Sequence, residues 1–235
     1  MSTARAGLRS SVARKLVNGL TGILAMLFII AHLLGNLTLL GGSRAFNTYA
    51  ESLHRLGFLV YVAEVGLVLL FGIHAVTAIQ VYLQKRESRR HAYAVVNTKG
   101  APSRQTIFSR TMIVTGSVLL VFLVWHVIQF RFGAWYTTSL DGHEVRDLYR
   151  LVYEVFQNPV WVVAYVVVMV LLGFHLRHGF WSAFQSLGAL GPRARPLAYS
   201  LGAVFAVVMA FGFIVLPVYM LLFAQEPFPA GLAVR

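Results

Sequence analysis

The stretch VVAYVVVMVLLGFHLRHGFWS, residues 162–182, opens with a continuous apolar run and closes with two histidines and an arginine. A helix needs about 20 predominantly apolar residues to cross the hydrocarbon core of a bilayer, and this stretch supplies most of them. An ionisable side chain inside such a helix is costly, and it is retained where it binds or pairs with another group. The stretch therefore predicts a membrane helix that carries a functional histidine, His175.

The composition of the whole chain agrees with a membrane protein. Of its 235 residues, 58% are hydrophobic and 12% are charged, and the mean hydropathy is +0.71. The chain contains no cysteine. This excludes disulfides and thiolate-bound metals, so any iron–sulfur cluster in its chemistry must belong to a partner. The formal net charge of +12 fits an anionic membrane surface better than nucleic acid.

The hydropathy pattern predicts an all-α polytopic membrane protein. Turn signals separate the apolar segments, at GGS 41–43, GAPS 100–103, NP 158–159 and GPRARP 191–196. The five predicted transmembrane helices are about 16–40, 58–84, 106–131, 159–185 and 197–223. They form one domain over residues 16–223, between a basic segment at 1–15 and a tail at 224–235. The first apolar run is too long for the core of a signal peptide, so we expect a retained helix.

The charges flanking these helices predict the orientation of the chain. Fourteen of the 20 Lys and Arg residues lie in or near the N-terminal segment, the second-to-third connection and the fourth-to-fifth connection. Acidic residues follow the opposite bias. By the positive-inside rule, the N-terminus is expected in the cytoplasm and the tail at 224–235 on the extracytoplasmic side.

Two helix pairs repeat one pattern. The first and third helices contain TGILAMLFIIAH and TGSVLLVFLVWH, in which Thr-Gly is followed by a histidine at the same spacing. The second and fourth helices share LLFGIH and LLGFH. The unit is a helix pair used twice, with the fifth helix as an addition. The repeat places one histidine at the corresponding point of four helices, namely His32, His74, His126 and His175.

The depth of these histidines divides them into two pairs. At about 1.5 Å per residue, His32 and His126 lie in the outer half of their helices, whereas His74 and His175 lie nearer the inner ends. We call His32 and His126 the outer pair, and His74 and His175 the inner pair. A single intramembrane histidine commonly serves an interhelical hydrogen bond, but four at paired depths favour two metal centres. A haem iron needs one imidazole on each side, which facing helices of a bundle can supply. The pattern therefore predicts two haems within the first four helices.

Two glycines lie at the level of the inner pair. Gly22 and Gly116 precede the outer-pair histidines by ten residues, or about 15 Å of helix. A residue without a side chain would let a flat macrocycle approach the backbone there. The same glycines could equally serve close helix packing.

These motifs resemble those of the cytochrome b membrane-anchor subunits of succinate:quinone oxidoreductase and fumarate reductase, in their single-chain, five-helix, two-haem form. The resemblance covers residues 10 to 223. Its matching stretches are SSVARK 10–15 with TG 21–22, HLLGNL 32–37, GIHA 72–75, SRTM 109–112, WHVIQF 125–130 and HLRHGFWSAFQSLG 175–188. The resemblance implies that the four histidines are the axial ligands of two b-type haems.

The resemblance also implies a place in a complex. A flavoprotein subunit with FAD would oxidise succinate, and an iron–sulfur subunit would dock on the cytoplasmic face of a bacterial cytoplasmic membrane. Electrons would pass through the two haems of this chain to a membrane quinone, menaquinone. Some members carry a glutamate close before the fourth ligand, where this chain has Gly173. The resemblance gives that glutamate a role in proton conduction, and this chain lacks the carboxylate for such a role at position 173.

Two alternative functions fit the same pattern. The chain could be the cytochrome b subunit of another quinone-linked oxidoreductase, such as a hydrogenase or formate dehydrogenase. It could also be a haem-free, proton-coupled transporter whose histidines line a path across the membrane.

Polar residues near the outer pair are candidates for a quinone site. Asn36 follows His32 by one turn, Gln129 follows His126 by three residues, and Glu64 is the acidic residue inside the second helix. An ionised carboxylate is costly there, so we expect Glu64 to be neutral, paired or open to a polar cavity, with structural pairing and quinone protonation both possible roles. For His54 an interfacial position is the first interpretation, and proton donation to the quinone is the alternative.

Three polar residues follow His175 on the fourth helix. Ser182 is two turns further on and shares the face of His175, so it could contact a haem propionate or a quinone. His178 shares that face as well, and a propionate contact is the first interpretation for it. Arg177 points to the other side and is expected to reach the headgroups.

Overall fold

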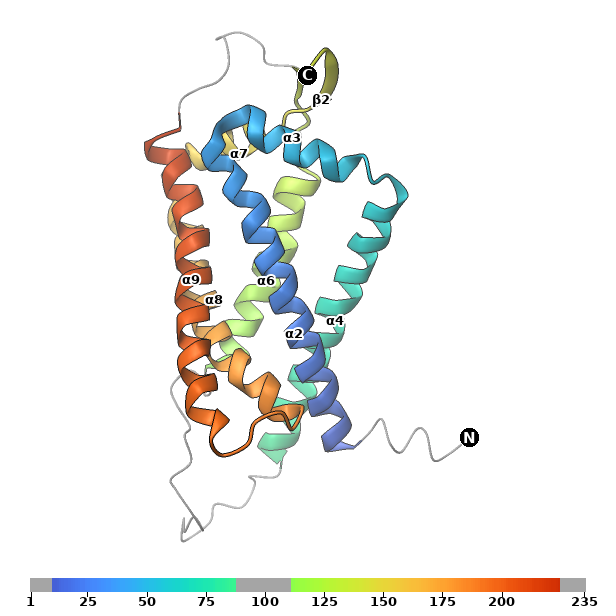
Figure 1. The fold of residues 1–235 in the computed structure, drawn as a ribbon, viewed down its shortest axis with the longest axis vertical. Coiled ribbons are helices and arrows are strands. Elements are labelled where there is room, and N and C mark those ends of the chain that lie inside the picture. Colours follow the sequence, from blue (N-terminus) through green and yellow to red (C-terminus); the bar gives the residue numbers. More distant parts are fainter. Residues whose placement is uncertain (1–9, 88–110, 225–235) are drawn as a thin grey trace.

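Five long apolar helices dominate the chain in a computed structural model that describes residues 10–87 and 111–224 (Figure 1). Within these residues, five helices are long and apolar enough to cross a membrane. They are α2 (Ser11–Asn36), α4 (Phe58–Glu87), α6 (Met112–Arg131), α8 (Pro159–Ser186) and α9 (Ala194–Leu222). The predicted all-α, multi-pass membrane architecture is confirmed.

The helix boundaries follow local capping signals. The Ser10 side chain accepts a hydrogen bond from the Ala13 amide, so α2 begins earlier than predicted. The Asn158 side chain caps α8 and Pro159 occupies its first turn, as the predicted turn at 158–159 requires. The predicted turn at 191–196 overlaps the start of α9, which begins at Ala194.

The first predicted helix was too long at its C-terminal end. The chain leaves α2 after Asn36, continues as a short 3-10 helix, η1 (Leu37–Gly41), and turns into α3 (Gly42–His54). Gly42 has a φ of +83°, a backbone conformation that glycine adopts without a steric penalty. The GGS signal therefore marks a change of helix direction.

Some predicted features lie outside the described residues. They are most of the basic segment at 1–15, the turn at 100–103, the start of the third helix before residue 111, and nearly all of the tail at 224–235. The division into a basic segment, a membrane domain and a tail stays a prediction.

The helices enclose a space between the two repeats. α2 packs against α4 and α8, α6 packs against α8, and α9 covers the far side of α8 along its whole length. Gly173 of α8 allows this close approach, because a Cβ atom there would lie 3.1 Å from the Ala210 Cβ of α9. Position 173 therefore packs against the fifth helix, and a glutamate would not fit there without moving α9.

One end of the bundle is covered by short elements that the hydropathy pattern did not predict. They are α3, a hairpin of β1 (Thr137–Leu140) and β2 (His143–Arg146), and α7 (Leu148–Phe156). Figure 1 shows them gathered across the end of the bundle, and we call this group the cap. Asp141 and Gly142 have φ angles of 50° and 83°, which is the geometry of a two-residue type I′ hairpin turn.

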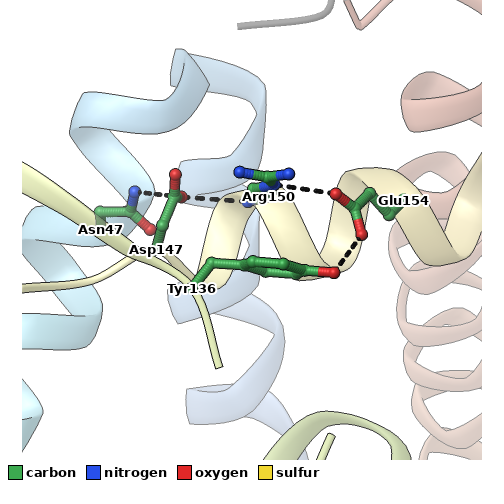
Figure 2. A network of polar contacts seen from close by, with 5 residues as sticks. All are labelled: Asn47, Tyr136, Asp147, Arg150 and Glu154. Atoms are coloured by element: carbon green, nitrogen blue, oxygen red, sulfur yellow. Dashed lines mark hydrogen bonds and ion pairs between the residues drawn. The ribbon is translucent and has the colours of Figure 1, made fainter. Parts of the chain in front are cut away.

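A polar network holds the cap together (Figure 2). Asn47 of α3 is 2% exposed, and its side-chain amide donates to Asp147 Oδ1 at 2.7 Å. The same Asp147 oxygen accepts from the Arg150 backbone amide at 3.1 Å. The Arg150 side chain then pairs with Glu154 at 2.8 Å, and the Tyr136 hydroxyl donates to Glu154 at 2.6 Å. This network fixes α3 to α7 and so fixes the lid of the enclosed space.

Candidate functional site

A cavity of about 2250 Å³ runs through the bundle between the repeated helix pairs. Pockets for a single small ligand have about 300–1,000 Å³, so this cavity has room for more than one large group. Its walls are mainly apolar side chains of α2, α4, α6 and α8, and the cap closes one end with Phe46, Leu148 and Phe156. All four repeated histidines line it.

The histidines meet in the two pairs that depth predicted. The ring centroids of His32 on α2 and His126 on α6 are 5.8 Å apart. Those of His74 on α4 and His175 on α8 are 6.5 Å apart. Two imidazoles bound to one iron at about 2 Å place their ring centroids roughly 6.3 Å apart. Both pairs therefore fit the insertion of a haem iron between the rings.

Within the described residues, the structure holds no cluster of three or more His, Cys, Asp or Glu side chains suited to a bare metal ion. Each pair supplies only two nitrogens. A porphyrin completes such a donor set, because it brings four nitrogens of its own.

The repeated Thr-Gly motif serves the inner pair. Thr21 Oγ1 lies 3.1 Å from His74 Nδ1, and Thr115 Oγ1 lies 3.3 Å from His175 Nδ1. A Cβ atom on Gly22 would lie 3.3 Å from Cε1 of His74. Threonine thus contacts the histidine ring while glycine leaves room for it. The sequence suggested that Gly22 and Gly116 leave room for a flat macrocycle. In the structure, the His74 imidazole itself lies against Gly22.

The outer pair has different polar neighbours. His126 Nδ1 lies 3.2 Å from the Tyr165 hydroxyl, which donates to Gln129 Oε1 at 2.7 Å. Asn36 donates to the His32 carbonyl oxygen at 2.7 Å, and its amide nitrogen lies 3.3 Å from His32 Nδ1. Tyr165 was missed by the sequence reasoning. The repeat could have identified Tyr165, because it occupies the position on α8 that corresponds to Glu64 on α4. Both residues precede the inner-pair histidine of their helix by ten residues.

Glu64 is engaged in an ion pair across the bundle. Its carboxylate accepts from Arg131 Nε at 2.6 Å, and the two side chains are each 39% exposed. The pair joins α4 to the end of α6, where these helices otherwise have few contacts. Glu64 and Arg131 both line the cavity.

The other residues proposed for an outer quinone site differ in whether they line the cavity. Asn36 lines the cavity. Within the described part of the chain, Gln129 and His54 are not among the lining residues: Gln129 faces Tyr165, and His54 is exposed at the end of α3. The sequence placed these residues at a similar depth, but depth alone does not fix the direction in which each side chain points.

The inner candidates on α8 lie along one wall. His178 and Ser182 line the cavity beyond His175. The His178 ring contacts Trp181 with centroids 5.6 Å apart, and Trp181 stacks on Tyr199 at 4.7 Å. Arg177 is not among the cavity-lining residues that the structure describes.

Comparison with known proteins gives one informative relative. The chain is 26% identical to the succinate dehydrogenase cytochrome b558 subunit of Bacillus subtilis (strain 168) over 186 residues, which cover 77% of this chain and 83% of that protein. No protein-family model matches the chain, and no solved structure matches it significantly. The relative confirms that this multi-pass chain resembles the cytochrome b membrane subunits of succinate:quinone oxidoreductase.

Proposed function

We propose that the chain is the dihaem cytochrome b anchor of a succinate dehydrogenase and carries electrons from an iron–sulfur subunit to a membrane quinone, menaquinone. One observation carries the proposal: two histidine pairs at the spacing of bis-imidazole haem ligation line one cavity. The name of the relative supports both the haem type and the enzyme. Succinate oxidation itself would take place on the flavoprotein partner.

In this proposal each pair holds one b-type haem. A haem iron supplies one-electron redox chemistry between its ferric and ferrous states. His74 and His175 hold the inner group, and His32 and His126 hold the outer one. Thr21 contacts His74 and lies eleven residues before His32 on α2, so the pairs are about 16 Å apart along the bundle.

The two ends of the cavity have different tasks. At the inner end, His178 and Ser182 extend the polar wall beyond His175 and would receive haem propionates or a quinone. The excess of basic residues in the adjoining connections favours the cytoplasmic face for this end, where the iron–sulfur subunit would dock. At the outer end, Asn36 and Glu64 line the cavity and could bind and protonate a quinone.

A spectrum of the purified complex tests the proposal. Reduction by succinate should produce b-type absorption bands from two haems per chain, and flavoprotein and iron–sulfur subunits should copurify. His74→Ala should remove the inner haem and leave the outer one. A chain without b-type bands would refute the proposal, and b-type bands that succinate cannot reduce would refute its assignment to succinate dehydrogenase.

A further inference from the structure

We propose that Thr21, Thr115 and Tyr165 are positioning residues that accept a hydrogen bond from the Nδ1–H group of a haem-ligating histidine. Their partners are His74, His175 and His126 in that order. Each bond would fix the tautomer in which the opposite ring nitrogen, Nε2, carries the lone pair that binds iron. This inference rests on the proposed haem function and adds the residues that set the strength of three of its four ligands.

The hydroxyl protons at the inner pair already have acceptors. Thr21 is buried, and its Oγ1 donates within α2 to the carbonyl oxygen of Val17 at 2.8 Å or Asn18 at 3.2 Å. A threonine hydroxyl has one proton and two lone pairs. Since the proton is directed to the helix backbone, the contact of 3.1 Å with His74 Nδ1 leaves the imidazole as the donor.

Thr115 repeats this arrangement in the second helix pair. Its Oγ1 lies 3.2 Å from both the Thr111 and Met112 carbonyl oxygens, and 3.3 Å from His175 Nδ1. Thr115 is 3% exposed. The same geometry at two corresponding places in the repeat is what a shared role in ligand positioning requires.

Tyr165 serves the outer pair from a different helix. Its hydroxyl proton is directed to Gln129 Oε1 at 2.7 Å, so the phenol oxygen is left to accept from His126 Nδ1 at 3.2 Å. The tyrosine is 6% exposed and is packed edge-on against Phe156 of the cap. Two hydrogen bonds therefore link the half-buried Gln129 through Tyr165 to His126.

Such a bond has a measurable consequence at the metal. An acceptor at Nδ1 raises the basicity of the imidazole and so favours the ferric over the ferrous iron. Loss of a partner of this kind typically costs about 10-fold to 100-fold in metal affinity. For a one-electron couple, a tenfold loss of ferric over ferrous affinity corresponds to about 59 mV of reduction potential.

The test is a redox titration of both haems in the purified complex. We expect Thr21→Val to raise the midpoint potential of the inner haem by the equivalent of about a tenfold change and to leave the outer haem unchanged. Thr21→Ser, which keeps the hydroxyl, should restore the original potential. Tyr165→Phe should produce the reverse pattern, with a shift at the outer haem only.

A matched control separates this role from general packing. The Thr77 hydroxyl on α4 also donates to a backbone carbonyl oxygen four residues earlier, that of Ile73, at 2.8 Å. It also lies within hydrogen-bond distance of Asn18 Oδ1 and the His74 carbonyl oxygen. Thr77→Val makes the same chemical change near the inner pair without removing an Nδ1 acceptor. It should leave both potentials unchanged.

Three results would overturn the inference: unchanged potentials in Thr21→Val and Thr115→Val, equal shifts of both haems, or an equal shift in Thr77→Val. If the valine variants do not accumulate, pulsed EPR of the unmodified complex reports the hydrogen bonding of Nδ1 in each ferric haem, and free Nδ1–H groups would also overturn it. Absence of haem from the unmodified complex refutes the proposed function instead.

Discussion

The space left by Gly22 provides a graded test of the inner haem site. A Cβ atom at this position would lie 3.3 Å from Cε1 of His74, whereas two carbon atoms prefer about 3.5–4.0 Å. Gly22→Ala therefore forces the imidazole to move by a few tenths of an ångström, and Gly22→Val forces a larger shift. Overpacking of this kind costs roughly 1–3 kcal/mol, which corresponds to about a 5-fold to 100-fold loss of haem affinity at 1.4 kcal/mol per tenfold.

The assay is the haem content of purified protein together with its reduced-minus-oxidised spectrum. We expect the inner-haem signal to decline from Gly22 through Ala to Val, with the outer-haem signal retained. Gly66→Val is the matched control, because position 66 is on α4 and a Cβ atom there has no neighbour within 4 Å. Full retention of both haems in Gly22→Val, or selective loss of the outer one, would refute the steric reasoning.

Three further outcomes are expected. Asn47→Ala removes the partner of the Tyr149 amide and one of the two donors to Asp147 Oδ1, and leaves the Arg150 amide as the other donor. It should lower the free energy of unfolding by about 2 kcal/mol, which denaturant unfolding in detergent measures; a loss near zero would contradict the cap's structural role. Glu64→Gln keeps the shape of the side chain but removes its ionisable group and its ion pair with Arg131, so it should slow succinate:quinone reductase activity; unchanged quinone reduction, with reduction of a soluble dye as the control, would exclude proton delivery by Glu64. The hydrogen bond to Glu154 and partial burial raise the pKa of Tyr136 above its usual value of 10.0. The contribution of Tyr136 to the free energy of unfolding should therefore be complete below pH 10 and be lost as the pH rises through the higher folded-state pKa. Unfolding measured against pH checks this, because Tyr136→Phe should abolish this alkaline dependence.

Local sequence carried most of the information about the membrane architecture. Span length and apolar composition predicted five helices because the hydrocarbon core has a fixed thickness and each residue of a helix adds a fixed rise. The same fixed rise predicted that His32 would meet His126, and His74 would meet His175, before any packing was known. The four repeated histidines indicated haem sites, and the absence of cysteine excluded a thiolate-bound metal.

The tertiary structure decided which side chains surround each of the four histidines. Tyr165 reaches His126, Gln129 faces Tyr165 and not the cavity, and Glu64 pairs with Arg131. Depth along a helix is set by residue count, but the direction of a side chain depends on how the helix is rotated against its neighbours, and packing between distant segments fixes that rotation. The sequence did not predict the cap for a related reason. Its short helices and hairpin are held by contacts between distant residues, such as Asn47 with Asp147, which are a hundred residues apart in sequence. These elements lack the long apolar run that marks a membrane span.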